Sequence, residues 1–149
     1  MRWPPVRLRS YIERIVKTVG AIGANIFPYW GGAASSTAGA AQGQAKALLA
    51  VLTPFGVKGV IITEEGWPSC NSPNQNPTDI NKEIDYYTSW KNRQNPVFDS
   101  YYFMAYNMSD ACEAEPMSDA DNHFGLCNAS GKTKNTGLIE CPAVTRPRR

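Results

Sequence analysis

The stretch Val57–Ser69, VKGVIITEEGWPS, decides how the rest of the chain is interpreted. Its β-branched run at 60–62 predicts a strand buried on both faces, as in a parallel sheet, and Gly66 ends that strand. Two carboxylates, Glu64 and Glu65, therefore stand where a buried strand opens into a loop, which is where α/β barrels carry their catalytic groups. A solvated acidic loop is the alternative, but the tryptophan and turn residues that follow favour a functional site.

The rest of the chain alternates helices with strands. Apolar residues at helical spacing, bounded by capping residues and by glycine or proline, predict three helices. The apolar runs between them are typical of buried strands, and the first run contains Asn25. Units of this length imply right-handed crossovers between parallel strands, and three strands alone would leave both sheet edges open. The expected helices lie between Ser10 and Gly20, Ala41 and Leu52, and Thr78 and Trp90, and the further strands are Ala21–Phe27 and Val97–Tyr106.

Composition narrows the class of protein. The 149 residues suffice for one domain with a core, and the net charge of +2 gives no indication of nucleic-acid binding. No apolar run is long enough to span a membrane. The N-terminus also lacks the apolar core of a signal peptide, so we expect either a cytosolic protein or a chain that lacks its true beginning.

The cysteines indicate disulfides rather than metal. Four cysteines without a Cys-x-x-Cys pair, and a single histidine at His123, argue against a zinc site, and we predict no metal and no cofactor. An even number of cysteines in loop-like surroundings fits an oxidising compartment and allows three pairings. Cys112 and Cys127 enclose a short loop and form one candidate pair.

The three strand ends are expected to form one functional rim, because parallel strands place their carboxyl ends at the same edge. Aromatic rings beside carboxylates and amides suit a sugar, whose ring faces stack while its hydroxyls need many hydrogen-bonding partners. Glycoside hydrolysis needs two carboxyl groups, but Glu64 and Glu65 are adjacent and point to opposite faces of a strand, so they are not that pair. The acids available near the third strand are Asp99, Asp110, Glu113 and Glu115. The rim residues are Asn25, Tyr29, Trp30, Glu64, Glu65, Trp67, Tyr106 and Asn107.

The segment 61–69, IITEEGWPS, resembles the signature of glycoside hydrolase family 17, the β-1,3-glucanases. That signature is an apolar run, Ser or Thr, the nucleophilic Glu, a small residue and Gly-Trp-Pro-Ser. The resemblance implies that Glu64 is the nucleophile, while Glu65 replaces the usual Thr, Ser or Ala and takes a supporting role. The segments 22–30, 103–107 and 123–126 resemble the family's sixth strand, its eighth strand and the Phe-Gly-Leu segment that follows.

This resemblance implies a TIM (β/α)8 barrel and a retaining mechanism. Such a barrel needs about 250 residues, so we interpret 1–149 as one C-terminal fragment of α/β fold with strands six to eight and irregular ends at 1–9 and 128–149. The family's general acid lies in a motif like Val-Gly-Asn-Glu, which this chain lacks. Met108 stands where the family carries an acid after its eighth strand, and Asp110 is the candidate substitute. The parent protein is expected to be secreted or bound to the cell wall.

Two functions follow from these patterns. The first is hydrolysis or transglycosylation of β-1,3-glucan, with the isolated chain inactive because it lacks the acid. The second is a non-catalytic remnant that binds glucan through aromatic residues. Trp67 and Tyr29 are equally interpretable as sugar-stacking residues or as packing at the barrel rim. The open strand edges also predict self-association.

Overall fold

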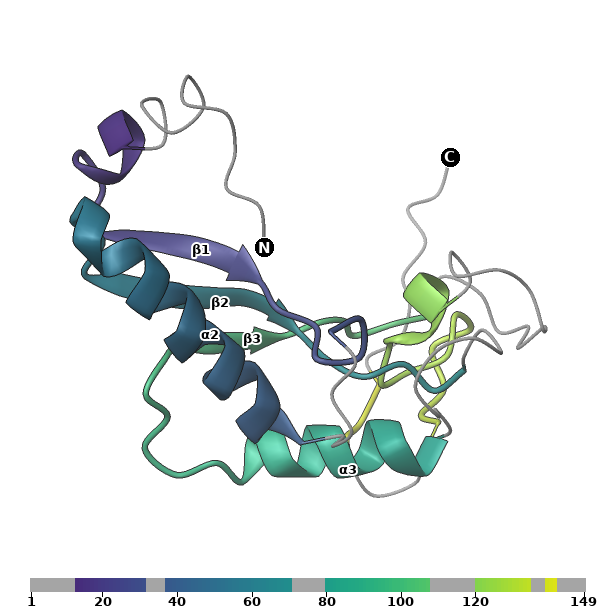
Figure 1. Cartoon of the computed structure of the whole chain (residues 1–149). Coiled ribbons are helices and arrows are strands. Elements are labelled where there is room, and N and C mark those ends of the chain that lie inside the picture. The colour runs from purple at the N-terminus through teal and green to yellow at the C-terminus, as the bar shows by residue number, and fades with distance from the viewer. Residues whose placement is uncertain (1–12, 32–36, 71–79, 108–119, 135–138, 142–149) are drawn as a thin grey trace, which may run out of the picture.

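The computed structural model describes residues 13–31, 37–70, 80–107, 120–134 and 139–141. Within them, three parallel strands form a sheet in the order β1-β2-β3, namely Ala21–Asn25, Gly59–Glu65 and Ser100–Tyr102 (Figure 1). Helix α2 (Ala38–Leu52) and helix α3 (Ile80–Lys91) make the crossovers. Short 3-10 turns, η1 and η2, occupy Thr53–Phe55 and Ala120–His123. The predicted α/β alternation with parallel strands is therefore confirmed.

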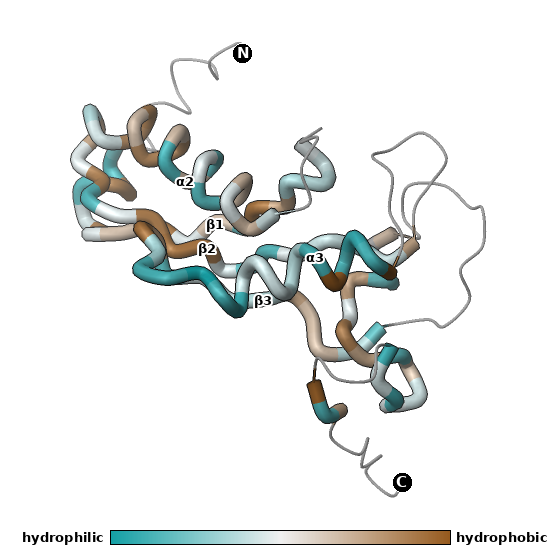
Figure 2. Tube along the Cα trace, turned by 90° about the horizontal axis from the view of Figure 1, so that it is seen from below, coloured by the Kyte–Doolittle hydropathy of each residue, from teal (hydrophilic) through white to brown (hydrophobic). Residues whose placement is uncertain are grey.

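Helix α2 packs on one face of the sheet (Figures 1 and 2). The small residues Ala41 and Ala45 are fully buried, so the helix backbone lies close to the strands. They pack against Val60 and Ile62, which point toward α2 from β2. The Gln42 side chain joins α2 to the segment before β3: its Nε2 donates to the Phe98 carbonyl at 3.0 Å, and its Oε1 accepts from the Phe98 amide at 3.0 Å.

The opposite face of the sheet is open in the described part of the chain. Gly23 and Asn25 of β1 and Thr63 of β2 are exposed, as are Ile61 at 38% and Tyr101 at 63%. The prediction that the run at 60–62 is buried on both faces is therefore wrong, and the prediction that β1 is a buried strand is wrong as well. Burial alternates along them because the described helices cover only one side of the sheet.

The first predicted helix ends earlier than expected. Its proposed cap lies outside the described residues, and the helical turn of residues 13–16 ends before Val19 and Gly20. The Thr18 hydroxyl donates to the Ile15 carbonyl at 2.7 Å, a side-chain bond to the backbone of the kind that competes with helix continuation.

The third strand is also shorter than the predicted Val97–Tyr106. Val97 is 77% exposed, and only Ser100–Tyr102 pairs with β2. Residues 104–107 instead pair with 124–127 through alternating backbone bonds, including Cys127 N to Ala105 O at 2.9 Å and Asn107 N to Cys127 O at 2.8 Å. A Cβ at Gly125 would lie 2.1 Å from the Asn107 nitrogen, so only glycine permits this close crossing.

A disulfide joins Cys127 to Cys141. The candidate pair of Cys112 with Cys127 is therefore wrong, and Cys70 is disulfide-bonded as well. Cys127 also lies in the ladder to residues 104–107, so the bond ties the 139–141 segment to the rest of the chain. None of the described helices is both long and apolar enough to cross a membrane.

Candidate active site

A β-bulge interrupts β2 where its two carboxylates begin. On the β1 side, Ala24 pairs with Ile62 and Asn25 pairs with Glu64, so Thr63 is an extra residue. The pairing with β3 also shows an extra residue in β2. Ile62 and Glu65, three positions apart, pair with Ser100 and Tyr102, which are two positions apart. Such bulges bend a strand and change the direction of its side chains.

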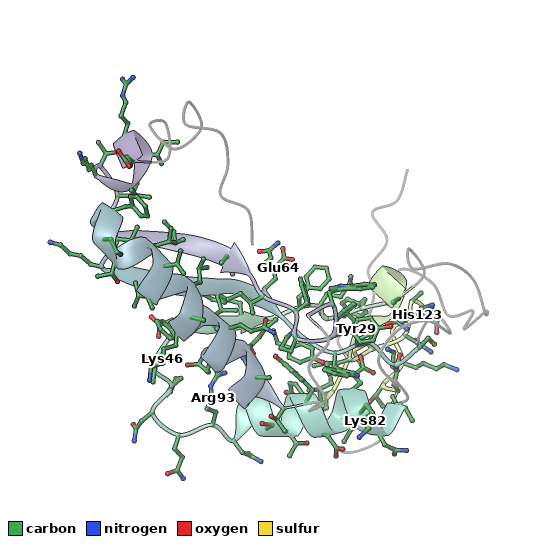
Figure 3. All side chains as sticks on the ribbon, viewed as in Figure 1. Tyr29, Lys46, Glu64, Lys82, Arg93 and His123 are labelled. Atoms are coloured by element: carbon green, nitrogen blue, oxygen red, sulfur yellow. A yellow bond between two sulfur atoms is a disulfide. The ribbon has the colours of Figure 1, made fainter. Side chains whose placement is uncertain are left out.

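The bulge decides which carboxylate faces outward. Ile62 is fully buried toward α2, and strict alternation would place Glu64 on that same side. The extra residue reverses the pattern, so Glu65 is 0% exposed and Glu64 is partly exposed. Figure 3 shows Glu64 on the side of the sheet away from α2. The expectation that the two carboxylates point to opposite faces is confirmed, but the bulge rather than plain alternation sets which one is open.

Asn25 and Thr63 lie beside Glu64 on this face. The Thr63 hydroxyl donates to Asn25 Oδ1 at 2.7 Å, and the Ile26 amide donates to the Glu64 carbonyl at 2.8 Å. These two bonds hold the ends of β1 and β2 together across the bulge. The structure thus brings the predicted Asn25 and Glu64 together at one strand edge, with the Glu64 side chain accessible.

Glu65 is held on the helix side by two residues from α3 and the segment after it. The Tyr86 hydroxyl donates to Glu65 Oε2 at 2.8 Å, and Arg93 Nη1 lies 3.2 Å from Glu65 Oε1. Burial, and then the neighbouring Glu65 carboxylate, raise the pKa of the Tyr86 hydroxyl, so it remains a donor. This geometry is compatible with the supporting role predicted for Glu65, which stays a prediction.

Tyr29 and Trp67 are packing residues in this structure. They are 0% and 2% exposed, with ring centroids 5.5 Å apart in an edge-to-face contact. Phe124 and Tyr86 surround them in the same buried cluster. Of the two interpretations left open for these residues, packing at the rim fits this structure, because neither ring presents a free face.

The other rim residues differ in how deeply they are buried. Trp30 is half-buried and contacts Tyr29 at 4.7 Å between centroids, and Tyr106 is half-buried beside Cys127. Asn107 is 8% exposed, and its Oδ1 accepts from the Gly125 amide at 3.0 Å, so its predicted contact with substrate becomes a structural one. Asp110 lies outside the described residues.

An open pocket of about 350 Å³ borders β1 next to this rim. Trp30 and Gln44 of α2 line this pocket, whereas the Asn25 side chain is bonded to Thr63 on the open face. An aromatic residue beside an amide side chain is a composition that suits sugar contacts. Its lining residues are Asn25, Ile26, Phe27, Trp30, Gln44 and Leu48.

A second buried carboxyl group, that of Glu83, is bonded to Lys134 near the C-terminal end of the described chain. Lys134 Nζ lies 3.1 Å from Glu83 Oε2, and it donates to Ser69 Oγ at 2.7 Å and to the His123 carbonyl at 3.2 Å. Burial raises the pKa of the Glu83 carboxyl to about 8, although Lys134 opposes the rise. This cluster joins α3, the loop after β2 and the segment around His123.

The residues that sequence reasoning missed are the buried Glu83 and the cationic partners of the two buried carboxyl groups, Arg93 and Lys134. Glu83 follows Ile80 by three positions, which is helical spacing on the predicted apolar stripe, and this was the available signal. Arg93 and Lys134 lie in polar segments that show no helical or strand periodicity, so no sequence pattern indicated their role. The described residues also contain no group of three His, Cys, Asp or Glu side chains arranged to hold a metal ion.

The fold and site define a class: a parallel α/β protein with an accessible carboxylate at the carboxyl end of its middle strand. Searches of the sequence against family models and against curated proteins find no match. Solved structures do match. The glycoside hydrolase family 17 β-1,3-glucanosyltransferase from Rhizomucor miehei is similar, with 25% identity and a TM-score of 0.56 over 88% of this chain and 46% of that one.

Two further structures agree. An active-site mutant of the Rhizomucor miehei transferase in complex with laminaritriose has a TM-score of 0.59, again at 25% identity and with 88% and 46% of the two chains covered. A β-1,3-glucanase and pollen allergen of Cryptomeria japonica shares the fold, with 17% identity and a TM-score of 0.59 over 83% of this chain and 48% of that one. The predicted resemblance to glycoside hydrolase family 17 is confirmed, and the chain spans about half the length of these structures.

Proposed function

We propose that this chain carries the nucleophile-bearing part of a retaining glycosidase acting on β-1,3-glucan. The observation that carries the proposal is the position of Glu64, accessible at the carboxyl end of β2 and next to Asn25. The similar structures are a glucanosyltransferase and a glucanase for the same polymer, and one of them binds laminaritriose. The three strands would then be about strands six to eight of a barrel.

The chemistry assigned to Glu64 is nucleophilic. Its carboxylate attacks the anomeric carbon of a glucosyl unit, and the bond from that carbon to the leaving glycosidic oxygen breaks as the glycosyl-enzyme forms. A general acid protonates the leaving oxygen. Water then displaces Glu64 in hydrolysis, or a glucan hydroxyl displaces it in transfer, and the proton of the incoming group returns to the acid's conjugate base.

We infer that this chain does not supply the general acid. Glu65 and Glu83 are buried and bonded to Arg93 and Lys134, and Asp99 lies just before β3, level with Ile62 rather than with the strand end that carries Glu64. Asp110, Glu113 and Glu115 lie outside the described residues. Loss of acid catalysis costs roughly 10²–10⁴-fold in rate, so we expect the purified chain not to hydrolyse laminarin.

Substrate contacts are assigned to the accessible rim residues. Asn25 would hydrogen-bond sugar hydroxyls, Trp30 would stack on a ring face, and Tyr106 is a further contact. The parent protein is proposed to be secreted or bound to the cell wall. The Cys127–Cys141 disulfide supports that location because disulfides persist in oxidising compartments.

The decisive test uses a substrate that does not need the acid. A 2-deoxy-2-fluoro-β-laminaribiosyl fluoride has a leaving group that departs without protonation, and its fluorine slows release of the glycosyl-enzyme. We expect mass spectrometry of digested protein to find the glycosyl adduct on Glu64. Glu64→Gln removes the adduct, whereas the matched control Asp85→Asn, an exposed change on α3, keeps it.

The same experiment separates the second function from the first. A non-catalytic glucan-binding remnant would bind laminaritriose without forming an adduct, and Trp30→Ala would abolish that binding. An adduct on another residue would refute the assignment of Glu64.

A further inference from the structure

A buried carboxylate lies directly behind the accessible one. Glu65 is 0% exposed and is bonded by Tyr86 of α3 and by Arg93 just after α3. The Arg93 side chain is itself only 15% exposed. A buried charge is tolerated when it is paired and hydrogen-bonded, so this cluster has two mutually dependent charges.

The cluster joins three elements at the bulge. Arg93 and the Trp90 indole both donate to the Ser100 hydroxyl at the start of β3, the latter at 3.0 Å. The Phe103 amide donates to the Glu65 carbonyl at 2.8 Å. Glu65 is therefore bonded through its side chain to the α3 region and through its backbone to the segment after β3.

The arrangement determines which of two adjacent glutamates faces the helices. Glu64 and Glu65 are chemically identical, so the pattern of residue types alone does not determine which one occupies the helix side. A shift of one residue moves a strand side chain to the other face, and the bulge makes such a shift local. The partners on the helix side favour whichever carboxylate reaches them.

We propose that Glu65, Tyr86 and Arg93 form a positioning clamp that fixes the bulge of β2 and thereby directs Glu64 to the open face. Glu65 is a positioning residue, since it acts through Glu64 and faces away from the open side. The functional consequence rests on the proposed function, in which Glu64 is the nucleophile. The geometric consequence does not, and it can be measured without any sugar.

The clamp predicts that replacing Glu65 with a smaller, uncharged residue turns Glu64 away from the open face. Glu65→Thr introduces one of the residue types that the family signature carries at this position, but it leaves the Arg93 cation buried without its carboxylate. The nearest carboxylate in sequence is Glu64, which we expect to turn inward and pair with Arg93. Removal of the cation as well, in Glu65→Thr/Arg93→Met, should release Glu64 to the open face.

Carbodiimide labelling with glycine ethyl ester, read by mass spectrometry at each carboxylate, tests this. In the unaltered chain Glu64 is labelled and Glu65 is protected. In Glu65→Thr the labelling of Glu64 falls by about tenfold or more, which corresponds to an inward orientation favoured by ~1.4 kcal/mol. The double variant restores it, and Asp85→Asn leaves it unchanged.

Two outcomes overturn the clamp: labelling of Glu64 that stays at the unaltered level in folded Glu65→Thr, or a double variant that does not recover it. Because Glu65→Thr is a change at a buried site, near-ultraviolet circular dichroism checks its fold. If it does not fold, the isosteric Glu65→Gln replaces it, with the same expectation and the same rescue by Arg93→Met. A positive labelling result with no fluorosugar adduct on Glu64 would retain the clamp and refute the proposed function.

Discussion

The buried Glu83–Lys134 pair makes the stability of this chain depend on pH in an unusual direction. The pKa of Glu83 rises from 4.5 to about 8 on folding, because burial disfavours its charged form more than Lys134 favours it. Between these pH values the folded state therefore binds more protons than the unfolded state. The contribution of Glu83 to stability is complete below pH 4.5 and is lost as pH rises toward 8.

The magnitude follows from the two pKa values. A carboxyl group loses ~1.4 kcal/mol of folding free energy per pH unit between them, so the total is roughly 5 kcal/mol. Glu83→Gln keeps the shape of the side chain and a hydrogen-bonding oxygen but cannot ionise. We expect its free energy of unfolding to stay nearly flat from pH 5 to 8 while that of the unaltered chain declines.

Urea unfolding followed by tryptophan fluorescence, at four pH values and without reductant, measures the difference. Asp85→Asn, on the exposed side of α3, is the control and should follow the unaltered chain. Lys134→Met removes the group that opposes the rise in pKa, so the decline should begin at the same pH and continue to a higher pH. Parallel pH profiles for Glu83→Gln and the unaltered chain would refute the reasoning.

Three further predictions concern packing and association. Gly66→Ala should lower the unfolding free energy by about 1–3 kcal/mol, because its Cβ would lie 2.4 Å from the Phe103 carbonyl oxygen. Gly43→Ala, with open space in exposed α2, should instead raise it by up to about 1 kcal/mol, and thermal melts compare the two. The exposed Ile61 and Tyr101 and the open strand edges predict self-association. A concentration-independent monomer in sedimentation velocity would contradict it, and Tyr101→Lys should weaken the association.

Sequence periodicity predicted the order of helices and strands well, because each helix or strand depends on the local spacing of its apolar residues. The apolar positions of α2 and the β-branched run of β2 are local signals, and the structure follows both. The end of β3 was not predictable in this way. Residues 104–107 read as strand, yet their partner is 124–127, and the choice of partner depends on the close crossing at Gly125.

The predictions for the candidate site likewise differ between features set by local sequence and features set by tertiary contacts. The position of Glu64 at a strand end came from the motif, but its direction depends on a bulge that is defined by pairing with β1 and β3. Tyr29 and Trp67 were open to two interpretations, since an aromatic residue at a strand end packs or stacks according to what surrounds it. Only the three-dimensional contacts, with Phe124 and Tyr86 closing around them, separate the two.

The Gln42 amide has a consequence beyond joining two segments. By donating to the carbonyl and accepting from the amide of the same residue, Phe98, it imitates the backbone of a neighbouring strand. It does so just before β3 begins its pairing with β2, so a helix side chain starts the alignment that the sheet continues. The position at which β3 begins therefore depends on α2. A substitution at Gln42 should shift the third strand and, with it, the rim at the carboxyl ends of the strands.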